Sequence, residues 1–178
     1  GNVTFTAVDR AGNTTMLKDD RVVVVDSIAP GVQVTWEDAG VVNGQYRNGD
    51  RTVTIVITEA NFFESDQEEG FLMITLKKTL NDGTFTDEQL KLEFVKNGDV
   101  YTARHTFDEE ADYVFGIQYT DRSGNYSGKY ETSFTIDKTM PIIEVTYDNN
   151  DVRNGKYFNS ERKATIAITE HNFVAADV

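Results

Sequence analysis

The chain has 178 residues, of which 30 are acidic and 17 basic, and its formal net charge is −13. This charge argues against binding to nucleic acid, whose phosphates require a surface rich in lysine and arginine, and against anionic membranes. The chain has no cysteine, which excludes disulfides, thiolate zinc sites and cysteine nucleophiles. No run approaches the roughly 18 apolar residues of a membrane-spanning helix, so we expect no membrane insertion in this segment.

Two signatures occur twice in the chain. Asp9-Arg10-Ala11-Gly12-Asn13 returns as Asp121-Arg122-Ser123-Gly124-Asn125, and segment 43–62 returns as 154–173, with 12 of 20 positions identical. The spacing of both signatures, about 110 residues, matches the size of one β-sandwich domain, which predicts a slice of a tandem array. We expect a complete copy at 27–137, the C-terminal strands of a preceding copy at 1–26 and the N-terminal strands of a following copy at 138–178.

Apolar and polar residues alternate along most of the complete copy, which is typical of half-buried strands. The alternating runs are 32–36, 53–57, 72–76, 90–94, 113–119 and 134–136, and the β-branched run 22–25 matches the last of them. Turn-forming pairs such as Asn43-Gly44 separate these runs. About seven short strands with regular turns predict an all-β protein with an Ig-like antiparallel β-sandwich. The only helix candidate is a turn at 87–90, with Thr86 as its N-cap.

The expected boundaries between copies are 26–30 and 137–141. Each segment begins with aspartate and ends with proline after three intervening residues, and proline fixes the backbone angle φ. Linkers this short predict a fairly fixed orientation of neighbouring domains. The array is therefore expected to be a semi-rigid rod.

The repeated patterns Asp-Arg-Ala/Ser-Gly-Asn, Asp-x-x-x-Pro and Asn-Gly-x-Tyr…Thr-Glu-x-Asn-Phe resemble those of Ig-like tandem repeats in large surface proteins of Gram-positive, often gut-dwelling, bacteria. The resemblance covers the whole chain and implies export to the cell surface or cell wall, and a non-enzymatic role in adhesion or ligand display. Some such proteins capture host ligands, including immunoglobulins, so it implies a host protein or glycan as partner beside neighbouring repeats of the same chain. A purely structural stalk or spacer is the alternative. The chain departs from antibody domains because it lacks the inter-sheet cystine, and Trp36 falls in the first strand instead of the third.

The sequence offers no complete catalytic constellation, so we expect no enzyme. Glu170 and His171 resemble a general-base pair, but Ala60 stands at the matching position of the other copy. His105 has no second histidine near it in the sequence. The segment 121–125 is interpreted as a hairpin turn, with Gly124 at positive φ and the Asp121 carboxylate accepting turn amides; an ion-binding loop is the alternative.

Two acidic clusters are candidates for calcium, since loops rich in carboxylates can gather oxygen ligands. The first contains Glu64 and Asp66, and the second contains Asp108, Glu109 and Asp112. The Asp-x-Asp-x-Asp-Gly pattern of a dedicated calcium loop does not occur in the sequence. Acidic loops are commonly just solvated, so no cofactor is expected.

Binding surfaces usually lie on loops carried by a rigid scaffold. The span from Glu64 to Asp99 has no second copy in the chain, and it is where we expect a protein-binding surface. Most aromatic residues follow the strand period and are predicted to be core. Phe63, Phe85 and Tyr126 do not, and they are the candidates if the domain is instead a carbohydrate-binding module. A lysine–asparagine side-chain crosslink, which stabilises some bacterial Ig-like domains, stays open.

Overall fold

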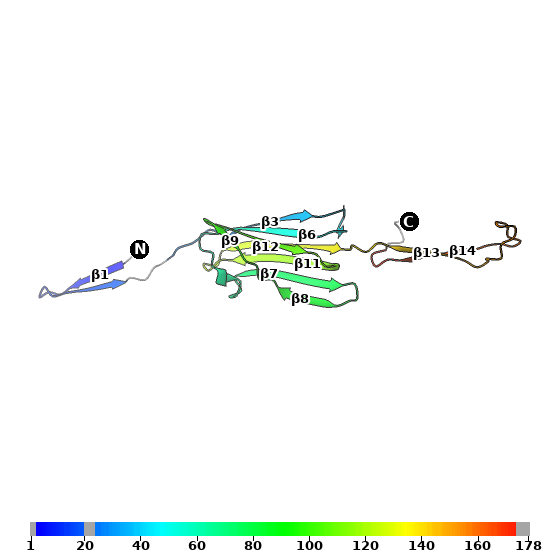
Figure 1. Ribbon diagram of the computed structural model, residues 1–178. Coiled ribbons are helices and arrows are strands. Elements are labelled where there is room, and N and C mark those ends of the chain that lie inside the picture. The colour runs from blue at the N-terminus through cyan, green and yellow to red at the C-terminus, as the bar shows by residue number, and fades with distance from the viewer. Residues whose placement is uncertain (1–2, 20–23, 174–178) are drawn as a thin grey trace.

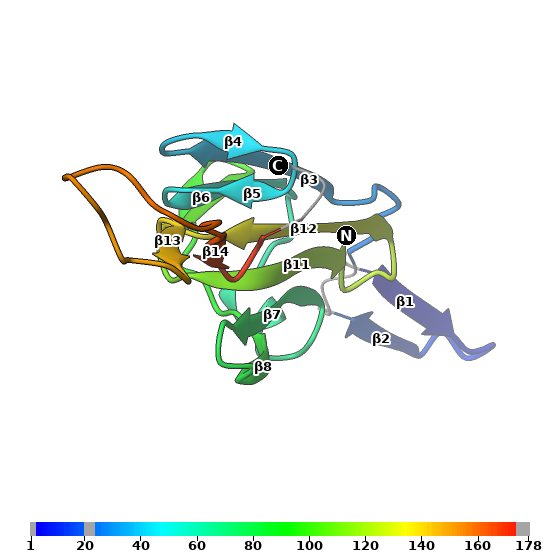
Figure 2. The same ribbon diagram turned by 90° about the vertical axis from the view of Figure 1, so that its right-hand side faces the viewer.

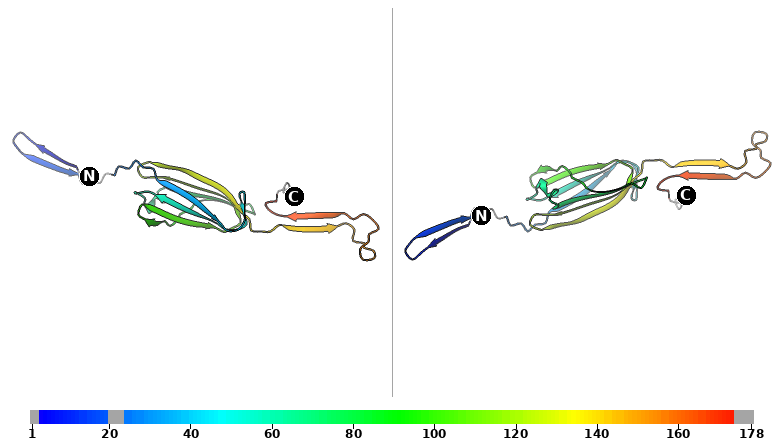
Figure 3. Two further views of the ribbon diagram at one scale, coloured as in Figure 1. Left: turned by 90° about the horizontal axis from the view of Figure 1, so that it is seen from above. Right: turned by 90° about the horizontal axis from the view of Figure 1, so that it is seen from below.

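The computed structural model describes residues 3–19 and 24–173, and these residues are nearly all β-strand. A central sandwich lies between two hairpins, and the three form a row (Figures 1 and 3). The described residues include one 3₁₀ turn, η1 (Glu64–Asp66), and no helix in this part of the chain is long and apolar enough to cross a membrane. The hairpins consist of β1 (Val3–Val8) with β2 (Thr14–Asp19) and of β13 (Ile142–Tyr147) with β14 (Ala164–Thr169).

Two sheets form the sandwich. The first has the order β3-β6-β10-β9, with β3 (Gly31–Asp38), β6 (Arg51–Thr58), β10 (Val100–Phe107) and β9 (Val95–Asn97). The second, which Figure 2 shows in the same order, is β4-β5-β12-β11-β7-β8, with β4 (Val42–Asn43), β5 (Tyr46–Arg47), β12 (Tyr126–Ile136), β11 (Ala111–Thr120), β7 (Leu72–Leu80) and β8 (Phe85–Gln89). Neighbouring strands are antiparallel except β5 and β12, which are parallel.

This strand order is that of an immunoglobulin-like domain. Immunoglobulin domains pair strands A, B, E and D in one sheet and G, F and C in the other, and variable-type domains add C′. In this sandwich, strands A, B, E and D correspond to β3, β6, β10 and β9. Strands G, F, C and C′ correspond to β12, β11, β7 and β8. The expected all-β, Ig-like sandwich is therefore confirmed.

The core follows from the alternation of side chains along each strand. Val53, Ile55 and Ile57 on β6 are fully buried, while the residues between them are half-buried. β7 and β11 alternate in a similar way, except that Gly116 is buried as well. The large buried residues of these two strands include Leu72, Ile74, Leu76, Tyr113, Phe115, Ile117 and Tyr119. Burial of each large apolar side chain contributes about 1.5–3 kcal/mol. The core residues predicted from the period of two are thus confirmed.

Trp36 on β3 packs into an aromatic cluster at one end of this core. Its ring centroid lies 5.4 Å from that of Phe115 and 5.3 Å from that of Phe134, both in edge-on geometry. Its indole Nε1 donates a hydrogen bond to Tyr130 Oη at 2.9 Å, and the Arg51 guanidinium lies 4.1 Å from its ring. Because Trp36 is the only tryptophan in the sequence, its fluorescence reports on the central sandwich.

The hairpins reproduce parts of the central copy. In β13–β14, Ile143 lies opposite Ile168, the register in which Val32 lies opposite Ile57 in β3–β6. In β1–β2, Val8 lies opposite Thr14 just as Thr120 lies opposite Tyr126 in β11–β12. The sequence repeat is therefore also a repeat of strand pairing.

The structure differs from the sequence-based expectations in a few places. Segment 87–90, expected to be helical, lies mostly in β8, which pairs with β7. Segment 90–94, expected to be a strand, leaves the ladder after the Leu90 amide donates to the Ile74 carbonyl, although Leu92 and Phe94 still pack on the core. The period of the strands predicts most aromatic residues to be core, yet Phe173 is 43% exposed, whereas its counterpart Phe62 in the complete copy is 7% exposed. The run 22–25 lies partly outside the described residues.

Candidate functional site at the junctions between repeats

The turn at 121–125 connects β11 and β12 and is built on the Asp121 side chain. Asp121 Oδ1 accepts the amides of Ser123 and Asn125, both at 2.8 Å, and Oδ2 accepts Asn125 Nδ2 at 2.8 Å. Gly124 has φ of 91°, which glycine adopts without steric cost. Burial acts to raise the pKa of Asp121, but these hydrogen bonds outweigh it, and the pKa lies below its ordinary value.

The turn between β1 and β2 is a copy of it. Asp9 Oδ1 accepts the amides of Ala11 and Asn13 at 2.9 and 2.8 Å, and Oδ2 accepts Asn13 Nδ2 at 2.7 Å. The hydrogen bond from the Asn13 side chain is the main cause that lowers the pKa of Asp9. The interpretation of both segments as hairpin turns held by aspartate is confirmed.

The first linker is hydrogen-bonded to the sandwich through Asp26. Asn61 Nδ2 donates to Asp26 Oδ2 at 2.7 Å, and Asn125 Nδ2 donates to the Asp26 carbonyl at 3.2 Å. Asp26 Oδ1 also accepts the Ile28 amide at 3.1 Å. Both asparagines belong to the repeated motifs, one from the segment after β6 and one from the β11–β12 turn, so the motifs meet at the linker.

The second linker repeats these contacts. Asn172 Nδ2 donates to Asp137 Oδ2 at 2.6 Å, as Asn61 does to Asp26, and the Thr139 amide donates to Asp137 Oδ1 at 3.2 Å. The sandwich adds contacts from its own side, since Lys138 Nζ donates to Asp50 Oδ1 at 2.7 Å. A surface pocket at this junction is lined by residues of the sandwich, the linker and the hairpin, including Tyr46, Arg47, Asp137, Pro141, Glu170 and Asn172.

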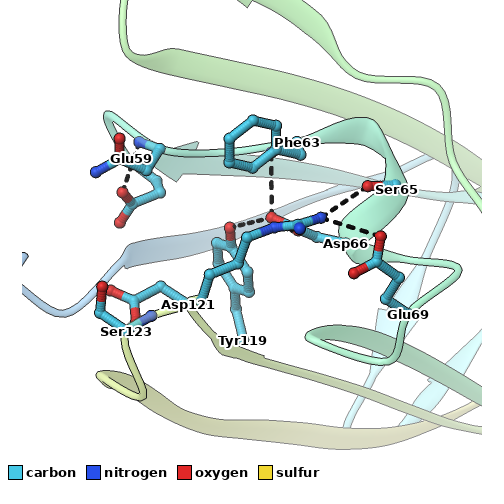
Figure 4. Close-up of polar contacts among 10 residues, drawn as sticks. Glu59, Phe63, Ser65, Asp66, Glu69, Tyr119, Asp121 and Ser123 are labelled. Atoms are coloured by element: carbon cyan, nitrogen blue, oxygen red, sulfur yellow. Dashed lines mark hydrogen bonds and ion pairs between the residues drawn. The ribbon is translucent and has the colours of Figure 1, made fainter. Parts of the chain in front are cut away.

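Three acids also converge at the first junction. A carboxylate oxygen from each of Asp26, Glu59 and Asp121 lies within 4.8 Å of the others. Burial is the main cause that raises the pKa of Glu59. Repulsion from the neighbouring acids raises this pKa further, and the hydrogen bond from the Asn61 amide acts to lower it. Figure 4 shows the Glu59 side chain directed toward the turn that carries Asp121 and Ser123. This is the one group of acids in the described part of the chain with the spacing of a metal site.

The first predicted calcium cluster lies on η1, close to this junction. Asp66 is completely buried, and it accepts hydrogen bonds from Tyr119 Oη at 2.6 Å, Arg122 Nε at 2.9 Å and the Phe63 amide at 3.1 Å (Figure 4). Arg122 also donates to Ser65 Oγ at 2.8 Å. Asp66 is therefore satisfied by protein donors and anchors η1 to β11, and it does not belong to the group of converging acids, nor does Glu64.

The second predicted calcium cluster lies at the opposite end of the sandwich, between β10 and β11. Glu109 Oε2 accepts Lys78 Nζ at 2.7 Å, and Asp112 Oδ1 accepts Thr135 Oγ1 at 2.5 Å. The Asp108 carbonyl accepts Lys138 Nζ. These acids are thus paired separately, and the structure does not gather them around one point.

The span from Glu64 to Asp99 forms η1, β7, β8, β9 and the irregular segment between β8 and β9. A surface groove is lined mostly by residues of this span, Glu64, Gln67, Leu92, Glu93 and Phe94, and by Phe62 just before it. Gln67 fixes one wall, since its side chain donates to the Leu92 carbonyl at 2.9 Å and accepts the Leu92 amide at 3.0 Å.

The three candidate aromatics for sugar stacking are exposed, but two of them, Phe63 and Phe85, lie at opposite ends of the sandwich. Phe63 is 49% exposed and stacks under Arg122, whose guanidinium carbon is 4.5 Å from the ring. Phe85 lies opposite Thr79, which itself lies opposite Asp112 at the other end of the sandwich. Tyr126 begins β12. The structure therefore does not place Phe63 and Phe85 on one platform.

The remaining candidates form no catalytic arrangement among the described residues. His105 packs edge-on against Phe107 with centroids 4.7 Å apart, and burial lowers its pKa. His171 is exposed beyond β14. Every lysine in the described ranges is at least partly exposed, so none of them is buried beside an asparagine as a side-chain crosslink requires.

Of the junction acids, only Asp121 was considered for ion binding from the sequence, as part of the alternative for segment 121–125; Asp26 and Glu59 were missed, although the repeat carries a signal for all three. Each acid belongs to a different repeated motif, and each is identical in its second copy: Asp26 and Asp137, Glu59 and Glu170, Asp121 and Asp9. The motifs point to one place only when the fold brings them together. Comparison with protein-family models and with curated proteins finds no match to this chain.

Proposed function

We propose that the chain is part of a tandem Ig-like array in an exported bacterial surface protein, where it acts in adhesion without enzymatic activity by holding successive domains in line. The observation that carries this proposal is the repeated linker contact, in which Asn61 binds Asp26 and Asn172 binds Asp137 at 2.7 and 2.6 Å. A flexible tether needs no such contacts, whereas a spacer needs them at every junction. The resemblance of the repeated motifs to those of bacterial surface proteins supports the setting.

The net charge of −13 is consistent with this setting, because it keeps densely displayed chains soluble and apart. It also disfavours nucleic acid as a partner. The partners that fit the proposal are the neighbouring repeats of the same chain.

Residual dipolar couplings measured on the intact chain test the proposal. Couplings from the sandwich and from β13–β14 are expected to fit a single alignment tensor. Two tensors of clearly different magnitude show that the junction is a hinge, and a spacer role is then wrong.

Ligand display is the second candidate, favoured by the groove that Leu92 and Phe94, from the span without a second copy, line together with Phe62. A panel of immobilised host proteins and glycans, with immunoglobulins and mucin included, tests it at physiological salt. Saturable binding that Leu92→Ser abolishes assigns display to this groove, with Tyr126→Ser outside the groove as the control. If the folded sandwich binds none of the proteins and glycans in the panel, ligand display is wrong and the spacer role is the one that remains.

A further inference from the structure

Three carboxylates converge where the first linker meets the sandwich. Asp26 comes from the linker, Glu59 from the end of β6 and Asp121 from the β11–β12 turn, and their oxygens lie within 4.8 Å of one another. Glu59 and Asp121 are only 5% and 2% exposed. Like charges this close repel one another, and a cation bound between the three carboxylates would offset that repulsion.

Glu59 gives an independent sign of a ligand. Its Oε1 accepts the Asn61 amide at 2.7 Å, but its Oε2 accepts no hydrogen bond from any described residue. No lysine, arginine or histidine in the described ranges forms an ion pair with any of the three carboxylates. Arg122, although next to Asp121 in sequence, pairs with Asp66 and Glu69. This oxygen is not fully enclosed, so it is an open ligand position that a cation can reach.

We propose that Asp26, Glu59 and Asp121 bind a calcium ion that ties the linker to the sandwich. A site made only of oxygen donors suits calcium or magnesium, whereas zinc and copper favour nitrogen and sulfur. Calcium accepts six to eight oxygens in flexible geometry, and magnesium demands a near-ideal octahedron. Ligands supplied by a linker, a strand end and a turn fit calcium better. Asn61 and Asn125 border the site, because both donate to Asp26.

All three acidic positions recur in the chain. Asp137 and Glu170 stand at the second junction in the places of Asp26 and Glu59, and Asp9 stands in the preceding copy in the place of Asp121. The exchange of Ala60 for His171 shows that the position next to Glu59 tolerates change, although Asn61 recurs as Asn172. Recurrence of all three acids is expected if every complete junction binds calcium. This inference rests on the proposed spacer function for its consequence, which is that extracellular calcium reinforces the rod.

Calcium titrated into the chelator-treated intact chain tests the site, with isothermal calorimetry and backbone amide NMR as readouts. We expect saturable binding with a Kd of about 0.1–1 mM, the range of extracellular calcium modules, and amide shifts confined to 26–28, 59–61 and 121–125 in the complete site, with a smaller set near Asp137 and Glu170. Glu59→Gln is expected to weaken binding at the complete site at least about tenfold. Glu109→Gln, in the other acidic cluster, is the matched control and leaves the affinity unchanged.

Absence of heat and of amide shifts at about 10 mM calcium, well above that range, overturns the proposal, and undiminished binding in Glu59→Gln shows that the ion is elsewhere. If Glu59→Gln fails to fold by Trp36 fluorescence, Asp26→Asn in the half-buried linker tests the same site. The dipolar couplings are measured in chelator. A single tensor there without calcium binding removes this inference and leaves the spacer role intact.

Discussion

The buried contact between Tyr119 and Asp66 gives the sharpest test of how η1 is held against the sandwich. Tyr119→Phe removes one hydroxyl and keeps the ring, which packs edge-on against Phe62 with centroids 5.9 Å apart. The lost hydrogen bond, 2.6 Å long, has a carboxylate as its acceptor, and hydrogen bonds to charged groups contribute about 1.5–3 kcal/mol. Asp66 keeps two donors, Arg122 and the Phe63 amide, so we expect a loss of about 2 kcal/mol in the free energy of unfolding.

Tyr113→Phe is the matched control on the same strand. Tyr113 is also buried, but its hydroxyl donates to the neutral carbonyl of Glu109 at 2.9 Å, a bond that contributes about 0.5–1.5 kcal/mol. Urea unfolding followed by Trp36 fluorescence measures both variants in the intact chain. Equal losses in the two variants would refute the reasoning, because they would mean that the charge on Asp66 contributes nothing to the bond.

Three further predictions concern the core and the turns. Burial raises the pKa of Tyr113 to about 12, above its ordinary value near 10 in the unfolded chain. The contribution of Tyr113 to stability is therefore complete below pH 10 and falls by about 1.4 kcal/mol per pH unit between pH 10 and 12. Burial also raises the pKa of Tyr119, so Tyr113→Phe should reduce the slope in thermal melts by the share of one tyrosine and leave the share of Tyr119. In Gly124→Ala the added methyl group meets no atom within 4 Å, but alanine is forced to φ of 91°. This strain should lower the free energy of unfolding by about 1–2 kcal/mol. Gly12→Ala, in the copied turn, should leave the unfolding transition followed by Trp36 unchanged. Ile55→Ala in the core should lower the free energy of unfolding by about 2–5 kcal/mol, and Thr54→Ala on the outer face should lower it by about 0.5 kcal/mol or less. Similar losses in the two variants would contradict the alternation of buried and outward-facing residues along β6.

The fold was largely predictable because its signals are local. The alternation of Val53, Ile55 and Ile57, and the repeated Asp-Arg-x-Gly-Asn turn, each depend on residues a few positions apart. Local rules failed where tertiary pairing decided the outcome. Residues 87–89 follow a possible helix N-cap, Thr86, but they form backbone hydrogen bonds with β7 as part of a strand. Leu92 packs on the core without belonging to a strand.

The candidate site was not predictable to the same degree, because its parts are far apart in the chain. Asp26, Glu59 and Asp121 each looked like part of a linker, a strand end or a turn, and only folding brings them together. The acidic clusters that stood out in the sequence, around Asp66 and Glu109, are instead satisfied by Tyr119, Arg122 and Lys78. Local charge density was thus a poorer guide to the site than recurrence of single acids at the same place in each copy.

The central claim is that the linkers are fixed to the sandwich by side-chain contacts. Backbone ¹⁵N relaxation on the intact chain without added calcium tests it at Ser27, Ile28 and Ala29. The contacts of Asp26 with Asn61 and Asn125 predict order parameters of about 0.85, the value of rigid backbone, and Asn61→Ala is expected to lower them at this linker while those of β6 stay unchanged. Values below about 0.6 in the unmodified chain, as in flexible segments, would show that the linkers are tethers and would contradict the account.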